Sequence, residues 1–175
     1  MKKLLIVVDM QNDFIDGALG TKEAVAIVPK VVEKIKNWDG DIIATRDTHT
    51  NDYMNTREGK YLPVPHCIKN TPGHEINEDV KDALMNSDAD VTVVEKNTFG
   101  CVGLPELVFR GKYDYVELVG LCTDICVVSN AMLIKAELPE IDMVVDATCC
   151  AGVTPDTHNA ALTTMKMCQI DVIGG

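Results

Sequence analysis

Four side chains capable of acid–base or nucleophilic chemistry each follow a short apolar run. They are Asp9 after residues 4–8, Asp47 after 41–45, Lys96 after 91–95 and, one short turn further on, Cys126 after 115–120. If these runs are parallel strands of one sheet, their carboxyl ends lie along one edge, where open α/β sheets bind ligands. The sequence therefore predicts that the four side chains meet in one site.

Cys126 is the candidate nucleophile of that site. It lies near the start of a predicted helix, 123–137, where backbone N–H groups and the helix dipole favour a thiolate. A lysine within reach would lower the pKa of the thiol further, and an aspartate could accept the proton and pass it to a leaving group. Position alone leaves an alternative open, because cysteine is most often a small core residue.

Potential metal ligands gather after the second apolar run. Asp47 and His49 are two residues apart, which places them on one face of an extended backbone. Glu58 and His66 follow in the same irregular segment. Two imidazoles and two carboxylates can hold a divalent ion such as Zn²⁺, Mn²⁺ or Fe²⁺. The residues alone leave open that they are solvated loop side chains.

The elements that must position these groups alternate between strands and helices. We predict strands at 4–8, 41–45, 91–95, 115–120, 143–146 and 170–173, and helices at 25–38, 75–85, 104–109, 123–137 and 155–167. Continuous rather than alternating hydrophobicity is typical of strands buried on both faces of a parallel sheet. We therefore expect one α/β domain over residues 1–175, with a doubly wound, mostly parallel sheet of about six strands and helices on both faces, in a Rossmann-like arrangement.

One stretch, residues 49–73, interrupts this alternation. It contains Asn, Asp, Gly and three prolines without a clear period. A loop of that length inside a compact domain is usually functional or disordered, and its His, Glu and Tyr residues favour a function. Outside the candidate site, His74 and His158 are expected at the surface near helix starts.

The composition restricts the partners and the compartment. There are 16 basic and 27 acidic residues, and the net charge of −11 repels nucleic acid and anionic lipid. No run approaches the roughly 20 apolar residues of a membrane span, and the first run ends at Asp9, too early for a signal peptide. Seven cysteines at irregular spacing argue against a disulfide framework. We expect a cytoplasmic protein that acts on a small molecule, without nucleic-acid or membrane partners.

Four short motifs occur in a characteristic order. They are Asp9-Met10-Gln11-Asn12-Asp13-Phe14, Thr45-Arg46-Asp47-Thr48-His49, Pro65-His66-Cys67 and Gly120-Leu121-Cys122-Thr123-Asp124-Ile125-Cys126. Together they resemble the successive motifs of the isochorismatase-like cysteine hydrolases, and within that superfamily the nicotinamidases are the most similar. The resemblance extends from Leu5 to about Thr157, and its first and last motifs are specific.

The resemblance implies a thioester mechanism. Cys126 would attack the carbonyl carbon, Asp9 would accept and return the proton, and Lys96 would support the thiolate. Ammonia or another amine would leave, and water would complete the hydrolysis. The backbone N–H groups of Cys122 and Cys126 would hold the oxyanion, next to a cis peptide bond before Cys122. Phe14 would form part of the wall that binds a ring.

The resemblance also implies a metal ion that orients the substrate. Asp47, His49 and His66 match the family's ligands, and Glu58 falls where some members use a glutamate. Zinc is expected, with manganese or iron as alternatives, and the ion would bind a pyridine nitrogen and ordered waters. Many nicotinamidases have a further histidine between His49 and His66, which this sequence lacks. The isochorismatase branch lacks the ligand set, which favours an amidase.

Two departures from the nicotinamidase pattern affect the wall of the pocket. Leu62-Pro63-Val64-Pro65 precedes His66 without the usual aromatic residue, and Lys96-Asn97-Thr98-Phe99 lacks the usual small residues. We predict a metal-dependent amidohydrolase acting on nicotinamide or a related small aromatic carboxamide. Relatives commonly self-associate, so a homo-oligomer is expected.

Two alternatives to the aromatic amidase remain. One keeps the same three catalytic residues but acts on another carboxamide, a carbamoyl compound or an isochorismate-like ether. The other is a metabolite-binding α/β module without catalysis, although no Gly-x-Gly-x-x-Gly follows the first strand.

Overall fold

The computed structural model describes all 175 residues, and strands alternate with helices along them. In chain order the elements are β1 (Lys3–Val8), α1 (Asn12–Ile15), α2 (Lys22–Lys36), β2 (Asp41–Asp47), η1 (Tyr53–Asn55), α3 (Arg57–Tyr61), η2 (Pro72–His74), α4 (Glu78–Met85), β3 (Val91–Lys96), α5 (Leu104–Gly111), β4 (Tyr115–Leu121), η3 (Thr123–Val127), α6 (Val128–Glu137), β5 (Asp142–Ala151), α7 (Pro155–Met167) and β6 (Asp171–Ile173). The six strands form one sheet in the order β3-β2-β1-β4-β5-β6, and every neighbouring pair is parallel. The predicted doubly wound α/β sheet is confirmed.

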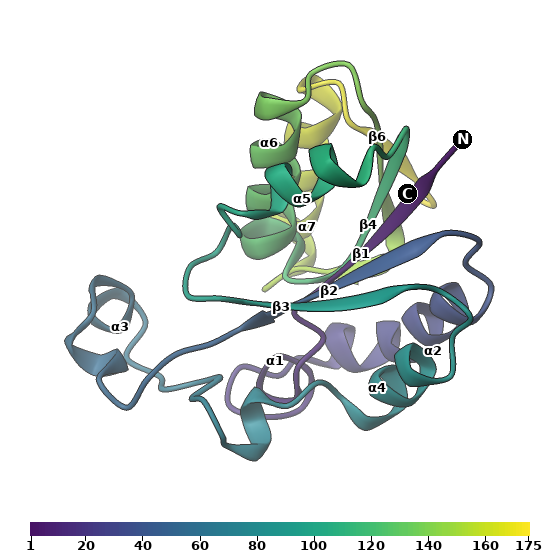
Figure 1. Ribbon diagram of the computed structural model, residues 1–175. Helices are drawn as coiled ribbons and strands as arrows, with labels where there is room; N and C mark the ends of the chain where they lie inside the picture. Colours follow the sequence, from purple (N-terminus) through teal and green to yellow (C-terminus); the bar gives the residue numbers. More distant parts are fainter.

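Helices cover both faces of the sheet and enclose two hydrophobic cores. Helices α1, α2 and α4 lie on one face, and α5, α6 and α7 lie on the other (Figure 1). Successive residues of a strand point to opposite faces, so Leu5 and Val7 of β1 enter the first core while Leu4, Ile6 and Val8 enter the second. This double burial explains why the strand sequences are continuously apolar.

The strand order reverses beside β1. From β1 the chain adds β2 and β3 on one side, and then returns to add β4, β5 and β6 on the other. The carboxyl ends of strands at such a switch point diverge and leave a crevice, which is where ligands bind in open α/β sheets. Val8 is in register with Thr45 of β2 and Gly120 of β4, so the residues after these three strands meet at that crevice.

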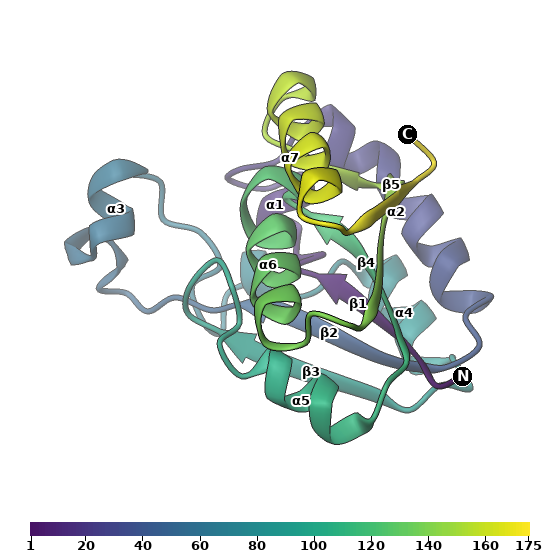
Figure 2. The ribbon, with the colours of Figure 1, turned by 90° about the horizontal axis from the view of Figure 1, so that it is seen from above.

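Residues 48–71 form an arm that extends beyond the carboxyl edge of the sheet. Figures 1 and 2 show this arm, with α3, projecting away from the layered body. Near its base, the N–H of Cys67 donates to the Asp13 carboxylate at 2.7 Å, and within the arm the Tyr53 hydroxyl donates to the Leu62 carbonyl at 2.9 Å. The irregular segment predicted from the sequence is therefore an ordered excursion with short helices of its own.

Several elements differ in their bounds from the prediction; for example, the helix predicted over 25–38 is Lys22–Lys36. The helix predicted over 75–85 begins at Glu78, because the Asn77 side chain accepts a hydrogen bond from the N–H of Val80 and caps it. The helix predicted over 123–137 opens with the π-helical turn η3. Strand β5 continues to Ala151, since it pairs with β4 again beyond a bulge. No helix is both long and apolar enough to span a membrane.

Candidate active site

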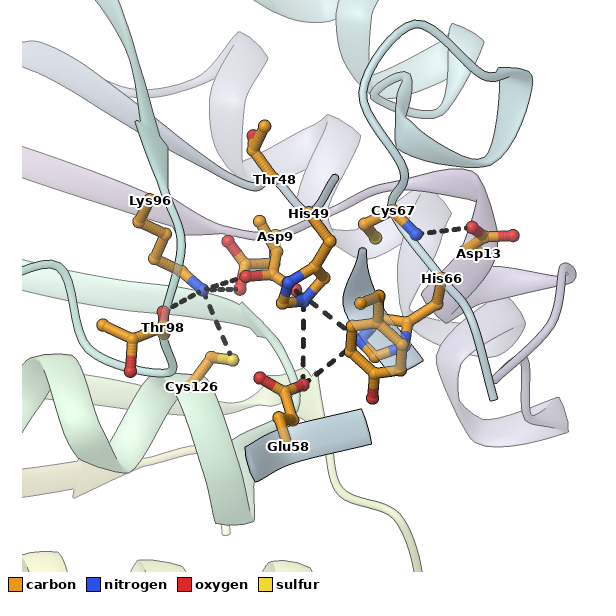
Figure 3. A network of polar contacts seen from close by, with 12 residues as sticks. Asp9, Asp13, Thr48, His49, Glu58, His66, Cys67, Lys96, Thr98 and Cys126 are labelled. Carbon is orange, nitrogen blue, oxygen red and sulfur yellow. Dashed lines mark hydrogen bonds and ion pairs between the residues drawn. The ribbon is translucent and has the colours of Figure 1, made fainter. Parts of the chain in front are cut away.

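The Lys96 ammonium is the hub of a buried polar cluster at the switch point (Figure 3). Lys96 ends β3, and its Nζ lies 2.7 Å from Asp9 Oδ2 and 3.3 Å from Asp47 Oδ1. The same nitrogen donates to the Thr98 carbonyl at 3.0 Å and to Cys126 Sγ at 3.6 Å. Burial lowers the pKa of Lys96, but the surrounding carboxylates more than reverse this and raise the pKa above its ordinary value. The lysine is therefore a fixed positive charge in contact with both the acid and the thiol.

Asp9 is held in place by Thr45 of the neighbouring strand. The Thr45 hydroxyl donates to Asp9 Oδ1 at 2.7 Å, and the Asp9 N–H in turn approaches the Thr45 hydroxyl oxygen at 3.2 Å. Burial raises the pKa of Asp9 above its ordinary value, although the Lys96 ammonium opposes the shift. A buried carboxylate with a raised pKa is suited to accept a proton during a reaction.

The Cys126 thiol lies in η3, directly before α6, and is 4% exposed. Burial and the Asp9 carboxylate raise the pKa of this thiol well above its ordinary value, and the Lys96 ammonium does not compensate. The expected low thiol pKa is therefore wrong for the resting site, because desolvation and the Asp9 carboxylate outweigh the lysine. Deprotonation of Cys126 requires a base, and Asp9 shares its lysine partner. The peptide bond between Leu121 and Cys122 is cis, as the resemblance implies.

A second cluster lies beside the first, where the arm returns to the sheet. One ligand atom from each of Asp47, His49 and His66 lies within 4.8 Å of the others. Glu58 Oε1, carried by α3, is 3.6 Å from His49 Nε2 and 3.5 Å from His66 Nε2. Asp47 belongs to both clusters, since one of its oxygens faces His49 and the other faces Lys96.

The chemistry of this second cluster fits a divalent metal ion. His49 Nε2 is buried without a hydrogen-bond partner, although Asp47 Oδ2 lies only 2.8 Å away. The ring of His66 contacts the Val64 carbonyl through Nδ1 at 2.8 Å, which directs the lone pair of Nε2 at the cluster. Two nitrogens and two carboxylates that converge in this way are a suitable ligand set for zinc.

Zinc should stabilise the folded protein through these ligands. At a free concentration of about 100 times the dissociation constant, binding adds roughly 2.7 kcal/mol, which corresponds to about 5 to 10 °C in the melting temperature of a chain this long. Burial lowers the pKa of His66, but Glu58 and the Val64 carbonyl raise it above its ordinary value overall. Protons and zinc compete for Nε2, so the zinc-induced shift should shrink as the pH falls through that raised pKa. Scanning calorimetry between pH 8 and pH 5 measures both effects.

A matched pair of variants checks which histidines are responsible. His49→Ala should lose the zinc-induced shift, whereas His158→Asn, outside the cluster, should keep it. Equal shifts in the two variants would show that zinc binds elsewhere.

A cavity of about 210 Å³ connects the two clusters to the exterior. Cys126 and Cys122 contribute to one part of its wall, and Asp47, Glu58 and His66 contribute to another. The remaining wall is mainly apolar and includes Phe14, Leu19, Leu62, Phe99, Ile125 and Val153. No lysine or arginine lines the cavity, so it suits a neutral ligand with an apolar body.

The structure brings all of the sequence-predicted site residues together. They are Asp9, Phe14, Asp47, His49, Glu58, His66, Lys96, Cys122 and Cys126. Two other histidines were placed wrongly at the surface. His74 is 1% exposed and contacts the Thr48 hydroxyl at 2.8 Å, and His158 is half-buried against the Thr123 hydroxyl at 2.7 Å.

Sequence reasoning also missed side chains that support the site. Gln11 is fully buried, donates to the carbonyls of Asp47 and His74 at 2.8 Å each, and accepts from the N–H of Asp47 at 2.7 Å. It therefore fixes the backbone of a metal-site residue. Its place two residues after Asp9, in an otherwise recognised motif, was the available signal.

Comparison with known proteins gives similarities over almost the whole chain. The family model of the isochorismatase domain matches residues 3–174. The nicotinamidase/pyrazinamidase of Mycobacterium tuberculosis is 28% identical, with 98% of this chain and 98% of that protein covered. The structure of pyrazinamidase/nicotinamidase from Streptococcus mutans has a TM-score of 0.86 at 26% identity and covers 98% of this chain and 100% of its own. That of the pyrazinamidase of Pyrococcus horikoshii in complex with zinc has a TM-score of 0.80 at 28% identity, with 99% of each chain covered.

Proposed function

Because the chain belongs to the isochorismatase family, we propose that it is a cysteine hydrolase of carbon–nitrogen amide bonds, with nicotinamide or a similar aromatic carboxamide as its substrate. The observation that carries the proposal is the position of Lys96 Nζ, 2.7 Å from Asp9 Oδ2 and 3.6 Å from the sulfur of Cys126, which lines the cavity. A nucleophile, a base and a fixed positive charge are the groups that acyl transfer through a thioester needs. The nicotinamidase and pyrazinamidase relatives support the same class of substrate.

The size of the cavity favours a single ring with one small substituent. An apolar cavity of about 150 Å³ holds benzene. The cavity of about 210 Å³ found here therefore has some 60 Å³ more, which suits a carboxamide group. Three of the proposed metal ligands, Asp47, Glu58 and His66, line the same cavity as Cys126, so a ring nitrogen and the carboxamide carbon of one molecule can be engaged together.

In the first half of the proposed reaction the amide is cleaved. Asp9 takes the thiol proton as Cys126 Sγ attacks the carboxamide carbon, and the carbonyl oxygen becomes an oxyanion. The backbone N–H groups of Cys122 and Cys126 stabilise that charge, as in other acyl-transfer sites. The intermediate collapses when the C–N bond breaks, and Asp9 returns its proton to the departing nitrogen. Ammonia leaves and a thioester on Cys126 remains.

In the second half of the proposed reaction, water hydrolyses the thioester. Asp9 removes a proton from a water molecule that attacks the thioester carbon, and the C–S bond breaks. The sulfur regains a proton from Asp9, and the carboxylic acid is released. Lys96 stays charged throughout and stabilises the negative charge that alternates between Asp9 and the sulfur.

We propose that Asp47, His49, Glu58 and His66 hold a divalent ion, with zinc as the first candidate. When bound, the ion supplies a Lewis acid that attracts a ring nitrogen and ordered water. The side chains of this cluster then orient the ring, while the apolar wall around Phe14 excludes water from its faces. The contact of Phe14 with the His66 ring, at 5.4 Å between centroids, places the wall against the metal site.

Glu58→Gln separates the aromatic amidase from the alternatives that keep the same nucleophile. In a metal-oriented amidase this variant should lose zinc affinity and kcat/KM for nicotinamide on the order of 10- to 100-fold, as metal sites do when a carboxylate partner is removed. An ether hydrolase or a carbamoyl hydrolase without metal orientation should be little affected. The measurement is ammonia release from nicotinamide by zinc-loaded protein, with Glu106→Gln, a change at an exposed residue of α5, as the matched control.

Two results would contradict the proposal. A failure of zinc-loaded wild-type protein to release ammonia from either nicotinamide or pyrazinamide would exclude the substrate class. Full activity in Glu58→Gln would exclude orientation by the metal cluster while leaving an amidase in place.

A further inference from the structure

Asn130 lies one helical turn after the nucleophile, on α6, and its side chain is fully buried. Its Nδ2 donates to the Cys126 carbonyl at 2.8 Å, and its Oδ1 accepts from the N–H of Cys101 at 2.7 Å. A longer contact of 3.5 Å joins Nδ2 to the Phe99 carbonyl. One amide group thus connects the backbone of the nucleophile with the segment between β3 and α5.

That segment contributes directly to the site. The Thr98 carbonyl accepts a hydrogen bond from Lys96 Nζ, and Phe99 lines the cavity next to Cys126. Apart from Asn130, this segment approaches the nucleophile helix through Gly100, where an added Cβ would lie 2.5 Å from the Leu133 side chain. The amide of Asn130 therefore supplies the hydrogen bonds that join the backbone of this segment to the backbone of the nucleophile.

We propose that Asn130 is a positioning residue that aligns the Cys126 sulfur with the Lys96 ammonium and the cavity wall. The bond to the Cys126 carbonyl fixes the backbone from which the sulfur projects. The bond to the N–H of Cys101 fixes the loop that contains Thr98, whose carbonyl accepts a hydrogen bond from the Lys96 ammonium. The inference rests on the proposed function for its catalytic readout, but the geometry of the nucleophile can be probed without any substrate.

The test combines turnover with alkylation of Cys126. Asn130→Ala should lower kcat for nicotinamide about 10- to 100-fold, the typical result of displacing a reacting group by about 1 Å, with a much smaller change in KM. The rate at which iodoacetamide labels Cys126 should fall in parallel. Labelling is followed by peptide mass spectrometry, because the chain has seven free cysteines.

Two further variants separate positioning from stability. Ile134→Ala, one turn further along α6 and fully buried, should lower the melting temperature without a comparable loss of kcat. Asn130→Thr should restore most of the lost kcat, since a threonine hydroxyl can donate to the carbonyl four residues earlier, as the Ser129 hydroxyl donates to the Ile125 carbonyl at 2.6 Å. If Asn130→Ala does not fold, the kcat and the labelling rate of Asn130→Thr are compared with those of the wild type instead.

Several outcomes would overturn the inference. They are alkylation and turnover of Asn130→Ala within about twofold of wild type, an equal kcat loss in Ile134→Ala, or an Asn130→Thr variant no faster than Asn130→Ala. If wild-type protein does not act on nicotinamide but Asn130→Ala still slows the labelling of Cys126, the proposed substrate is wrong and the positioning role stands.

Discussion

Replacing Cys126 with alanine should abolish ammonia release from nicotinamide, with a loss of at least about 10⁴-fold in kcat. Enzymes that pass through a covalent intermediate lose this much or more when the nucleophile is removed, because the remaining groups cannot form the acyl-enzyme. Substrate binding should survive, since the apolar wall and the metal cluster are untouched. Calorimetric titration with nicotinamide should therefore give a dissociation constant within a few-fold of the wild-type value.

A buried cysteine outside the site provides the control. Cys149 of β5 is 3% exposed and lies in the core beneath α2, so Cys149→Ala tests the loss of a buried thiol without touching the cavity. That variant should keep nearly full turnover. Residual activity above about 1% in Cys126→Ala would mean that Cys126 is not the nucleophile, as covalent catalysis leaves far less than this.

Replacing Lys96 with methionine should destabilise the metal-free protein by about 3–5 kcal/mol at pH 7, the range measured when one partner of a buried ion pair is removed. The substitution keeps most of the side-chain volume but leaves the Asp9 and Asp47 carboxylates buried without their shared cation. Turnover should be lost as well, because Asp9 would retain a proton and could no longer act as a base. Chemical denaturation of chelator-treated protein measures the stability change.

The pH dependence of this destabilisation has a defined sign. Burial already raises the pKa of Asp9 above its unfolded value, and without Lys96 the pKa should rise further. A carboxyl group with a raised folded-state pKa favours the native state when protonated, so the stability deficit should shrink as the pH falls from 7 toward the unfolded pKa of about 3.9. A deficit that stays constant between pH 7 and pH 5 would contradict this account.

Lys34 offers a matched control for Lys96. It lies on α2, where its Nζ bridges the Glu117 and Asp146 carboxylates at 2.6 and 2.9 Å, on the sheet rather than at its carboxyl edge. Lys34→Met should therefore also destabilise the protein but preserve kcat. Equal kcat losses in the two variants would show that Lys96 acts only through stability.

The arrangement of the site could be predicted because it follows from local rules. Once Leu4–Val8 and the other apolar runs are assigned to parallel strands, the residues after them must share an edge, and Asp9, Lys96 and Cys126 meet there. The second cluster was predictable for a similar reason, since Asp47 ends a strand and His49 follows in an extended segment. Self-association and a cytoplasmic location stay predictions.

The features of the site that could not be predicted depend on contacts between residues far apart in the sequence. The direction of the pKa shift of the Cys126 thiol could not be predicted, because it depends on how completely helix and sheet exclude water from the thiol. The burial of His74 depends on how the arm returns to the sheet, which no local pattern encodes. Asn130 in the sequence resembles any polar residue of an exposed helix, and only the packing of the segment after β3 against α6 makes it a buried bridge.

The arm formed by residues 48–71 has a consequence for how such a protein can diverge. Asp9, Lys96 and Cys126 stand at strand ends held by two cores, whereas His49, Glu58, Leu62 and His66 are carried by the arm. Insertions and substitutions in a surface excursion are tolerated far better than changes in a sheet. Over evolutionary time the arm can therefore be remodelled, and the preferred substrate exchanged, while the proposed catalytic residues on the sheet are inherited unchanged.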